Sequence, residues 1–529
     1  MKIQIDNIFL TPDEPADKIP TFILKHFGCQ ITDYRIVRKS LDARNKSNII
    51  YKYRIVAEVS DETAIPLLVN KDITEYRERY ERAPFPNPVE QTVIKKGSKI
   101  IIAGFGPAGM FTALRLIDAG YIVRIIERGK MVDERIKDIK ALEREGILNT
   151  ESNVLFGEGG AGTYSDGKLT ARTGRPEMSW LFLRLIRAGA PESITYEARP
   201  HLGTDRLGSI VQNIRKEIID AGSEIIFNER IDDILLRNSR VAGIKTSSGH
   251  EYPCDILILA TGHSARDIYE LLNRKRIIIE KKDFAVGVRV EHPLELINSI
   301  QYGNSRYRDI LPAADYSLAY KNERTGRGTY SFCMCPGGSV INSSSESGLL
   351  CNNGMSFSGR DFRFSNSAII VTVKKDDFYD GGLGGIEFQR MLERSAFHAG
   401  GGAFRAPAQR MSSFMARRCD SSLPESSYRN GITSSDINLY MPSWITDEIK
   451  MALSSFNRKM KGFISDNGLL IGAETRSSSP VRITRGDDFQ SVNTPGLYPV
   501  GEGSGYAGGI VSSAVDGIRA ADCIIEMKK

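Results

Sequence analysis

The sequence contains little that would suit an exported or membrane-embedded protein. Its 529 residues include seven cysteines, an odd and scattered set that favours a reducing compartment over a disulfide framework. The first residues, MKIQID, lack the apolar core of a secretion signal. The longest apolar stretches, such as 255–260, have the length of a strand and not of a membrane span. We therefore expect a cytoplasmic protein with no membrane partner.

The chain also lacks a strong charge bias, internal repeats and low-complexity tracts. A net charge of +6 is mild on a chain of this length and does not demand a nucleic-acid partner. Cys333 and Cys335 have no second cysteine pair with which to build a metal cage, so we expect no metal site. The length predicts several domains with a sizeable core.

One segment carries a complete nucleotide-binding pattern. Residues 99–109 form an apolar strand that runs into the glycines of a GxGxxG motif at the start of a helix, and a second apolar strand ends at Glu127. The first glycine permits a tight turn, the second lets backbone approach a pyrophosphate, and the third lets helix and strand pack closely. The phosphates are expected at the positive end of the helix that begins near Pro107, and Glu127 is placed to accept hydrogen bonds from a ribose. The motif glycines are Gly104, Gly106 and Gly109.

Two later segments favour FAD over NAD. This chain resembles the glutathione-reductase-type flavoproteins, in which the first βαβ unit holds the ADP half of FAD and a late strand ending in Gly-Asp or Gly-Glu passes the ribityl chain. Residues 498–502 fit that late strand, with Glu502 where Asp is commoner, and residues 259–263 match the ATG turn of the same superfamily. The helix after Gly508 and Gly509 would aim free N–H groups at the flavin ring.

A glycine-rich segment at 155–170 points to the same cofactor. So many small residues suggest a backbone that approaches a ligand closely, although a plain connecting loop is the alternative. Here the chain resembles a family of bacterial FAD-dependent dehydrogenases of unknown substrate. The resemblance implies FAD binding and an oxidoreductase fold. Its matching stretches are 156–168, 201–205, 333–338, 353–356 and 406–409.

These segments together define the expected FAD site. The expected cofactor-binding residues are Gly104, Gly106, Pro107, Ala108, Gly109, Glu127, Arg128, Gly160, Ala161, Gly162, Ser165, Lys168, Ile231, Thr261, Gly262, Gly501, Glu502, Gly509 and Ile510.

The expected fold is α/β: a Rossmann-like FAD-binding domain of the glutathione-reductase type, with an inserted α+β substrate domain and a small N-terminal α/β module. The module covers residues 1–82, a proline-rich linker covers 83–97, and the FAD-binding domain is split between 98–282 and 466–529. The insert covers 283–465, where strand-like runs alternate with loops rich in Gly and Ser. Within the FAD-binding part, 223–249 is expected to form a β-meander.

The sequence does not identify a catalytic acid or base. His201, His263 and His398 could each donate a proton, but a structural role is commoner for any single histidine. Lys168, Arg405 and Arg476 stand beside Gly- or Ser-rich loops and could pair with an anionic substrate, or could equally be solvated surface cations. Cys333 and Cys335 should share one face of a strand, where core or pocket-lining thiols are favoured over a strained disulfide.

The N-terminal module is locally basic. Tyrosines interleave with its cations, a composition that suits a nucleic-acid surface, although a solvated face or a surface docked on the flavin domain is favoured. The cations are Arg35, Arg38, Lys39, Arg44, Lys46, Lys52 and Arg54.

Three functions follow from these patterns. The first is an FAD-dependent oxidoreductase that transfers hydride between flavin and a small organic substrate; since no second GxGxxG motif precedes a full βαβ unit, NAD(P)H would bind transiently or not at all. The second is a flavin-dependent RNA-modifying enzyme that grips RNA through the basic module. The third is a flavin redox sensor without enzymatic turnover.

Overall fold

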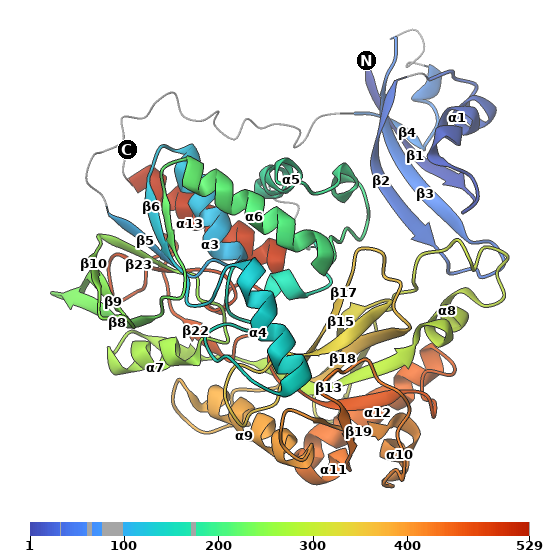
Figure 1. Cartoon of the computed structure of the whole chain (residues 1–529). Helices are drawn as coiled ribbons and strands as arrows, with labels where there is room; N and C mark the ends of the chain where they lie inside the picture. Colours follow the sequence, from blue (N-terminus) through green and yellow to red (C-terminus); the bar gives the residue numbers. More distant parts are fainter. Residues whose placement is uncertain (32, 61–65, 77–98, 171–175, 528–529) are drawn as a thin grey trace.

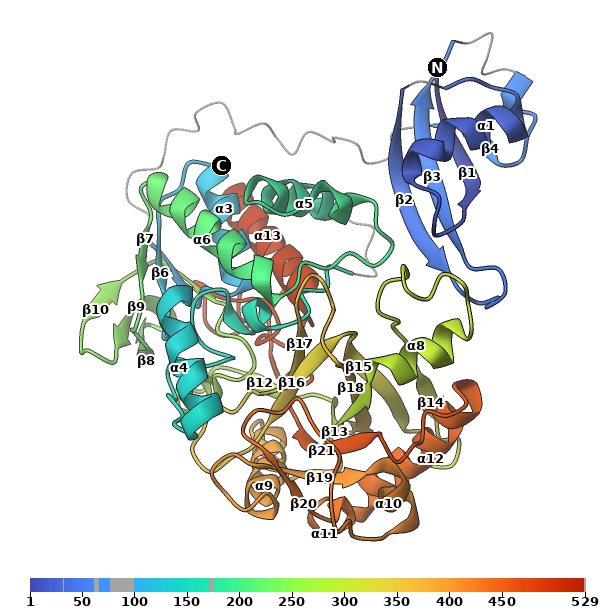
Figure 2. The same cartoon turned by 45° about the vertical axis from the view of Figure 1, so that its right-hand side comes forward.

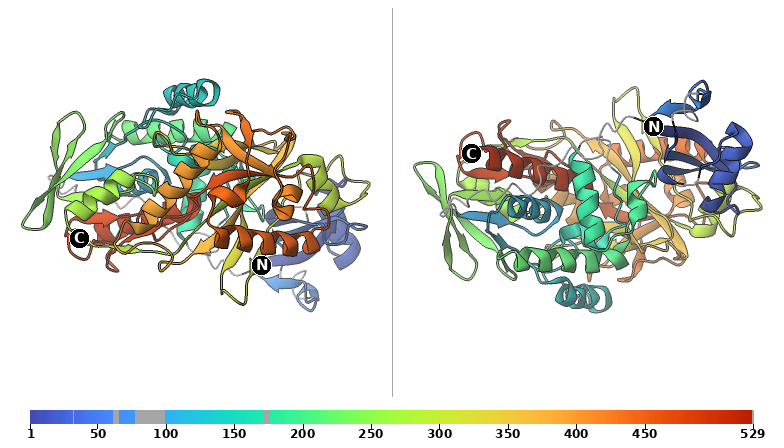
Figure 3. Two further views of the ribbon diagram at one scale, coloured as in Figure 1. Left: turned by 90° about the horizontal axis from the view of Figure 1, so that it is seen from below. Right: turned by 90° about the horizontal axis from the view of Figure 1, so that it is seen from above.

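The computed structural model describes residues 1–31, 33–60, 66–76, 99–170 and 176–527. Figure 1 shows a small N-terminal module, a domain built on a parallel sheet, and a larger mixed domain below it. Figure 2 shows that the module lies against the mixed domain near α8 (Leu294–Tyr302). In Figure 3 the N-terminal module and the C-terminal helix occupy opposite ends of the molecule. The expected linker at 83–97 and residues 77–82 of the expected module lie outside the described residues.

The N-terminal module is a four-stranded antiparallel sheet with a helix on one face. Its strand order is β2-β3-β1-β4, with β1 (Lys2–Leu10), β2 (Tyr34–Asp42), β3 (Ile50–Glu58) and β4 (Ile73–Glu75). Alternate residues of β1 point inward because side chains alternate along a strand, so Ile3 and Ile5 are fully buried against Ile19 and Ile23 of α1 (Ile19–Phe27). The short helix η1 (Ala16–Lys18) precedes α1.

The region expected to bind FAD, called the parallel-sheet domain below, is built on a five-stranded parallel sheet of order β23-β11-β5-β6-β7. Its strands are β5 (Ile100–Ala103), β6 (Val123–Ile126), β7 (Glu224–Ile226), β11 (Ile256–Leu259) and β23 (Leu497–Pro499). The near-continuous apolar runs follow from burial on both faces, since Ile100 and Ile102 enter one core cluster and Ile101 and Ala103 enter another.

Helices cover one face of this sheet (Figure 1). They are α3 (Pro107–Asp118), α5 (Glu177–Arg187), α6 (Thr204–Asp220) and α13 (Ile510–Met527). The chain reaches α5 and α6 through α4 (Val132–Glu145), η2 (Gly160–Tyr164) and η3 (Glu192–Thr195).

A three-stranded antiparallel sheet and α7 (Arg266–Arg274) cover the other face. This sheet joins β8 (Ile231–Arg237), β9 (Arg240–Thr246) and β10 (Glu251–Pro253). The β-meander expected for 223–249 is wrong in one respect. Its first strand, β7, pairs in parallel with β6 at the edge of the main sheet, and only the following strands form the antiparallel unit. Short strands alone do not reveal which sheet they join.

The mixed domain is built on a seven-stranded sheet of order β14-β15-β18-β13-β21-β19-β20. Its strands are β13 (Phe284–Pro293), β14 (Ala319–Lys321), β15 (Gly328–Cys335), β18 (Phe364–Val373), β19 (Ala406–Arg410), β20 (Ile432–Ser434) and β21 (Leu469–Glu474). Because β21 pairs with both β13 and β19, the sheet extends past the boundary expected at 465.

Helices pack against this sheet around a large apolar core. Besides α8 they are α9 (Gly384–Ala399), α10 (Met411–Ala416), α11 (Ile437–Tyr440) and α12 (Ser443–Lys459). Two antiparallel pairs complete the domain: β16 (Gly338–Asn342) with β17 (Asn352–Ser356), and β12 (Ile279–Lys281) with β22 (Val481–Ile483).

Candidate functional site

One cavity is lined by residues of both the parallel-sheet domain and the mixed domain. It extends from the GxGxxG loop, past the glycine-rich segment, to the wall made by β15 and β17. Of the expected cofactor-binding residues, only Gly109 is absent from its lining. The lining residues that were expected are Gly104, Gly106, Pro107, Ala108, Glu127, Arg128, Gly160, Ala161, Gly162, Ser165, Lys168, Ile231, Thr261, Gly262, Gly501, Glu502, Gly509 and Ile510.

The three motif glycines have different neighbours. Gly104 has φ +98°, and a Cβ there would lie 2.6 Å from the carbonyl oxygen of Ala260 on the neighbouring strand end. A Cβ on Gly109 would lie 2.0 Å from the Gly104 oxygen, so Gly109 serves helix–strand packing and does not face the cavity. A Cβ on Gly106 would have no protein atom nearer than 3.8 Å, which leaves room for a ligand at the start of α3.

Glu127 accepts several hydrogen bonds from the protein backbone, in addition to the ribose contact expected of it. One carboxylate oxygen accepts the backbone N–H of Phe105 at 2.8 Å. The other accepts the N–H groups of Gly129 at 2.9 Å and Gly157 at 3.0 Å. Glu127 therefore fixes the GxGxxG loop to the glycine-rich segment while it borders the cavity.

Arg135 holds the glycine-rich segment from beneath, and sequence reasoning missed it. Its guanidinium is fully buried and donates to the backbone oxygens of Asn153, Val154, Glu158 and Gly160 at 2.7–2.9 Å. Burial lowers the pKa of Arg135 to about 10, which leaves it charged at neutral pH. A lone arginine in an amphipathic helix gives no local signal for such a role, since most arginines on such helices face solvent.

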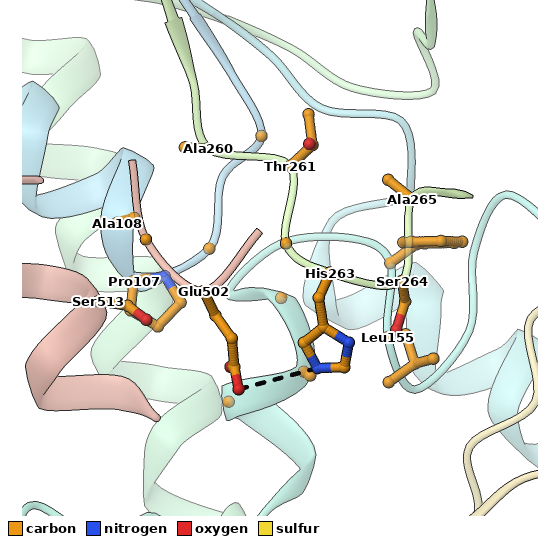
Figure 4. A pocket seen from close by; sticks show the side chains of 18 of the residues that line it. Pro107, Ala108, Leu155, Ala260, Thr261, His263, Ser264, Ala265, Glu502 and Ser513 are labelled. Carbon is orange, nitrogen blue, oxygen red and sulfur yellow. Dashed lines mark ion pairs between the residues drawn. The ribbon is translucent and has the colours of Figure 1, made fainter. Parts of the chain in front are cut away.

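The late segments meet the GxGxxG loop across the cavity. Figure 4 shows the side chains of His263 and Glu502 pointing toward each other, with His263 Nε2 3.9 Å from Glu502 Oε1. Burial lowers the pKa of His263 to about 3, and the charges of Arg476 and Arg266 act in the same direction. Burial raises the pKa of Glu502 to about 7. At neutral pH this is consequently a neutral imidazole beside a carboxyl group near its titration midpoint.

Arg476 lines the cavity within a buried charge cluster. Its guanidinium donates to both carboxylate oxygens of Glu393 at 2.9–3.0 Å, and Arg266 donates to the same carboxylate at 2.7–2.9 Å. The two arginines hold the pKa of Glu393 well below its usual range in spite of burial. Since Arg266 belongs to α7 and Glu393 to α9, the cluster joins the parallel-sheet domain to the mixed domain.

Lys168 reaches from the glycine-rich segment to the mixed domain. Its Nζ donates to the backbone oxygen of Met334 on β15 and lies 3.7 Å from Asp166 Oδ2. Asp166 is buried and also accepts from Arg360. The other candidates are elsewhere, because His201, His398 and Arg405 do not line the cavity.

Several further lining residues were not expected. Phe156, Arg230, Ser264, Ser343 and Asn353 all border the cavity. Phe156 and Asn353 lie in the segments 155–170 and 353–356 noted in the sequence, whereas no local motif marks Arg230, Ser264 or Ser343.

The basic N-terminal surface is largely engaged in internal contacts. Arg44 pairs with Asp42 and Arg54 with Asp6. One further cation contacts the rest of the chain, since Lys46 Nζ donates to the Ile300 oxygen at 2.7 Å, and the backbone N–H of Lys39 donates to the Tyr196 oxygen at 2.8 Å. These contacts favour a docked surface.

In the part of the chain that the structure describes, no helix has the length and apolar character needed to cross a bilayer. Over the same residues, no group of three or more His, Cys, Asp or Glu side chains could hold a metal ion.

Comparison with known proteins identifies relatives of the chain. An uncharacterised protein of Clostridium beijerinckii is 42% identical over 533 residues, which cover 99% of each chain. The chain belongs to the family of that clostridial protein. Residues 283–477 match a family described as FAD-dependent protein, C-terminal domain-like, and residues 2–58 match a domain of unknown function, DUF8436. The cofactor is FAD.

The solved structures to which the chain is similar are distant in sequence. The flavin-dependent brominase Bmp2 is 13% identical, with a TM-score of 0.37 over 81% of this chain and 79% of that one. A geranylgeranyl bacteriochlorophyll reductase-like protein of Thermoplasma acidophilum is 13% identical, with a TM-score of 0.36 over 81% and 78%. The glycerol-3-phosphate dehydrogenase of Bacillus halodurans is 10% identical, with a TM-score of 0.34 over 82% and 65%. At these scores the likeness carries no argument about this chain's activity.

The cavity residues fit FAD. The space beside Gly106 opens at the N-terminus of α3, where Pro107 occupies the first turn and no side chain caps the helix. Unsatisfied N–H groups at such an end favour a pyrophosphate. The same cavity continues to Glu502 and to the N-terminus of α13 at Ile510. A long ligand would therefore find contacts along the whole length of the cavity.

Proposed function

We propose that this protein is an FAD-dependent oxidoreductase that transfers hydride between flavin and a small organic substrate. The proposed reaction site is the junction between the parallel-sheet domain and the mixed domain. The observation that carries this proposal is the continuity of the cavity, which runs from the nucleotide-binding loops to Phe332 and Cys333 on β15 and Asn353 on β17. A cofactor that merely stabilised the fold would not need a cavity shared with a second domain.

The cofactor would be held as in the glutathione-reductase type, which this arrangement resembles. In that assignment Gly106 and the first turn of α3 hold the pyrophosphate, and Glu127 and Arg128 border the ribose and adenine end. Gly160 to Gly162 and Ser165 would pass beneath the cofactor, while Ile231, Thr261 and Gly262 would line its flank. Gly501 and Glu502 would contact the ribityl chain, and Gly509 and Ile510 would present helix N–H groups to the ring. Bound FAD supplies a centre that accepts or donates hydride.

The mixed domain would form the wall of the substrate site, and the parallel-sheet domain would supply one cation. Lys168 is the cavity cation that reaches the mixed domain, since its Nζ donates to the backbone oxygen of Met334 on β15, and 32% of its side chain is exposed. Arg476 is already satisfied by Glu393, so it would orient neighbours and shape the wall. Asn353 would contribute an amide to the same wall. A substrate with a carbonyl or carboxylate group matches this donor set.

Two features of the cellular setting are part of the proposal. We assign the protein to the cytoplasm from its cysteine usage. NAD(P)H would act as a transient external donor, if it acts at all, since the chain has one GxGxxG motif with its βαβ unit.

Stopped-flow kinetics under anaerobic conditions tests the function. Oxidised holoenzyme is mixed with donors (NADH, NADPH, hydroxy acids, amines), and photoreduced holoenzyme is mixed with acceptors (quinones, enones, disulfides). The proposal predicts that one chemical class reacts at least about tenfold faster than it does with free FAD, and that Lys168→Met raises the KM for that class. Uniformly slow, unselective reaction with every compound would overturn it in favour of a redox sensor.

A further inference from the structure

Two cysteine thiols lie side by side where the mixed domain meets the cavity. Cys333 lines the cavity, and Cys335 is fully buried directly behind it. The thiol of Cys335 donates to the backbone oxygen of Cys333 at 3.3 Å, and its side chain lies close enough to that of Cys333 to lower the pKa of Cys333. One thiol is therefore open to a cavity ligand while its partner is shielded.

A β-bulge produces this arrangement and corrects the expected strand geometry. In β15, Phe332 pairs with Ala368 and Cys335 with Asn366, so two residues, Cys333 and Met334, oppose one residue of β18. Cys333 adopts φ +45°. The regular strand expected here is interrupted at Cys333, because the bulge inserts an extra residue at this point.

The thiols lie in electropositive surroundings. Arg289, which is fully buried, donates to the backbone oxygen of Cys333 at 2.7 Å and lies 3.4 Å from Cys335 Sγ. Lys168 binds the backbone oxygen of the intervening Met334. The hydrogen bond from Cys335 lowers the pKa of Cys333, and the charges of Lys168 and Arg289 lower it further. Cations beside a partly accessible thiol are the setting in which thiolates become reactive.

Two carboxylates beside these cations act against the lowering of the Cys333 pKa, but they do not cancel it. Glu474 pairs with Arg289 at 2.9 Å, and burial raises the pKa of Glu474 to about 7. Asp166 Oδ2 lies 3.7 Å from Lys168 Nζ. Both carboxylates bind cations directly, so the cations remain fixed beside the sulfur atoms.

We propose that Cys333 and Cys335 form a dithiol–disulfide pair that exchanges two electrons with the flavin in the cavity. The proposal rests on the proposed redox function of the same site. In the oxidising direction the two S–H bonds break and one S–S bond forms, which releases two electrons and two protons. The flavin takes both electrons and one proton, and the second proton leaves to solvent. Cys333 is the sulfur that faces the cavity, and Cys335 is the resolving sulfur.

The remaining cysteines have different settings and provide internal controls. Cys419 is exposed on a loop of the mixed domain, and Cys254 is buried, with burial raising its pKa to about 12. Cys351 is buried 3.4 Å from the hydroxyl of Thr475. None of these three lines the cavity.

Electron counting tests the proposal without any substrate. Air-oxidised holoenzyme is titrated anaerobically with dithionite, and denatured samples of the oxidised and reduced protein are alkylated and weighed. The proposal predicts four electrons per chain, two for flavin and two for the disulfide, and two fewer alkylated thiols in the oxidised sample, mapping to Cys333 and Cys335. Cys335→Ser should take only two electrons, whereas Cys419→Ser should behave like the wild type.

The contrary result is equally clear. If the wild-type holoenzyme takes two electrons and all seven thiols alkylate in the oxidised sample, the dithiol proposal is overturned. The wild-type count decides the matter even where the cysteine variants fold poorly. This test can fail independently of the test of the proposed function. The electron count requires no organic substrate, whereas the stopped-flow experiment requires one and does not depend on a disulfide.

Discussion

His263 Nε2 and Glu502 Oε1 face each other in the cavity at 3.9 Å, and burial disfavours the charged form of both side chains. The imidazole comes from the turn after β11 and the carboxyl group from the turn after β23, which are adjacent strands of the parallel sheet. The carboxyl ends of parallel strands meet at one edge, so residues nearly 240 positions apart form one side of the site. The pair therefore provides a titrating carboxyl group next to a neutral ring.

The Glu502 carboxyl group should make the FAD-free protein less stable at high pH. Its folded-state pKa is raised to about 7 from an ordinary value of 4.5, so the folded state disfavours the charged form. The penalty is absent below the lower value and reaches roughly 3 kcal/mol above the higher one. Glu502→Gln should consequently raise the thermal midpoint of FAD-free protein at pH 8 and leave it unchanged at pH 4.

The exposed Glu526→Gln on α13 is the matched control and should shift neither midpoint. An equal shift for Glu502→Gln at both pH values would contradict the assigned titration.

Glu127→Gln should weaken the fold and FAD binding together. An amide can accept with only one of its two heavy atoms, so the N–H of Phe105 or those of Gly129 and Gly157 lose their acceptor. An unsatisfied buried donor costs about 1–3 kcal/mol, and we expect FAD affinity to fall about tenfold or more. Calorimetry of FAD-free protein measures the thermal midpoint, and a titration with FAD measures the affinity, so the effect on the fold is separated from the effect on binding. An unchanged thermal midpoint with weakened FAD binding would mean that Glu127 acts only on the ribose.

Glu393→Gln should destabilise the joint between the two large domains. Removing its charge leaves Arg266 and Arg476 buried with reduced compensation, and breaking such a buried cluster costs about 3–5 kcal/mol. Glu387→Gln, which removes the partly exposed i,i+3 partner of Arg390, should cost less than about 1 kcal/mol. Urea unfolding followed by circular dichroism measures both. Equal midpoints for the two variants would rule out the structural role given to Glu393.

The N-terminal module should show no salt-sensitive RNA binding. Arg44 and Arg54 form ion pairs with Asp42 and Asp6, and Lys46 contacts the mixed domain. Three of the seven cations of the basic surface are therefore engaged, which reduces the counterion release that phosphate binding would bring. Fluorescence anisotropy of the full-length protein with single-stranded RNA at low salt should remain flat. Binding that weakens with salt, and that is lost in Lys52→Glu, would instead support the RNA-modifying alternative.

Local patterns predict the parts of the site whose geometry is set by neighbours in sequence. The GxGxxG loop and the turns at Thr261 and Gly501 are each recognisable, because glycine is required where backbone takes a left-handed turn or approaches another strand. Arg135 and the Arg266–Glu393 pair have no such signature, since their roles depend on backbone oxygens and helices brought together by folding. The bulge at Cys333 is hidden for the same reason, because it depends on pairing with β18.

The FAD content of Gly106→Trp protein tests the central assignment most directly. A Cβ at position 106 has no protein atom within 3.8 Å, so an indole there would project into the cavity without breaking the turn that Gly104 requires. Absorbance of the purified proteins gives the ratio of FAD to chain, and the thermal midpoint of FAD-free samples reports whether the fold survives. We predict that the wild type carries close to one FAD per chain and that Gly106→Trp carries almost none, with matching FAD-free midpoints. A folded Gly106→Trp protein that retained full FAD content would contradict the placement of the cofactor in this cavity.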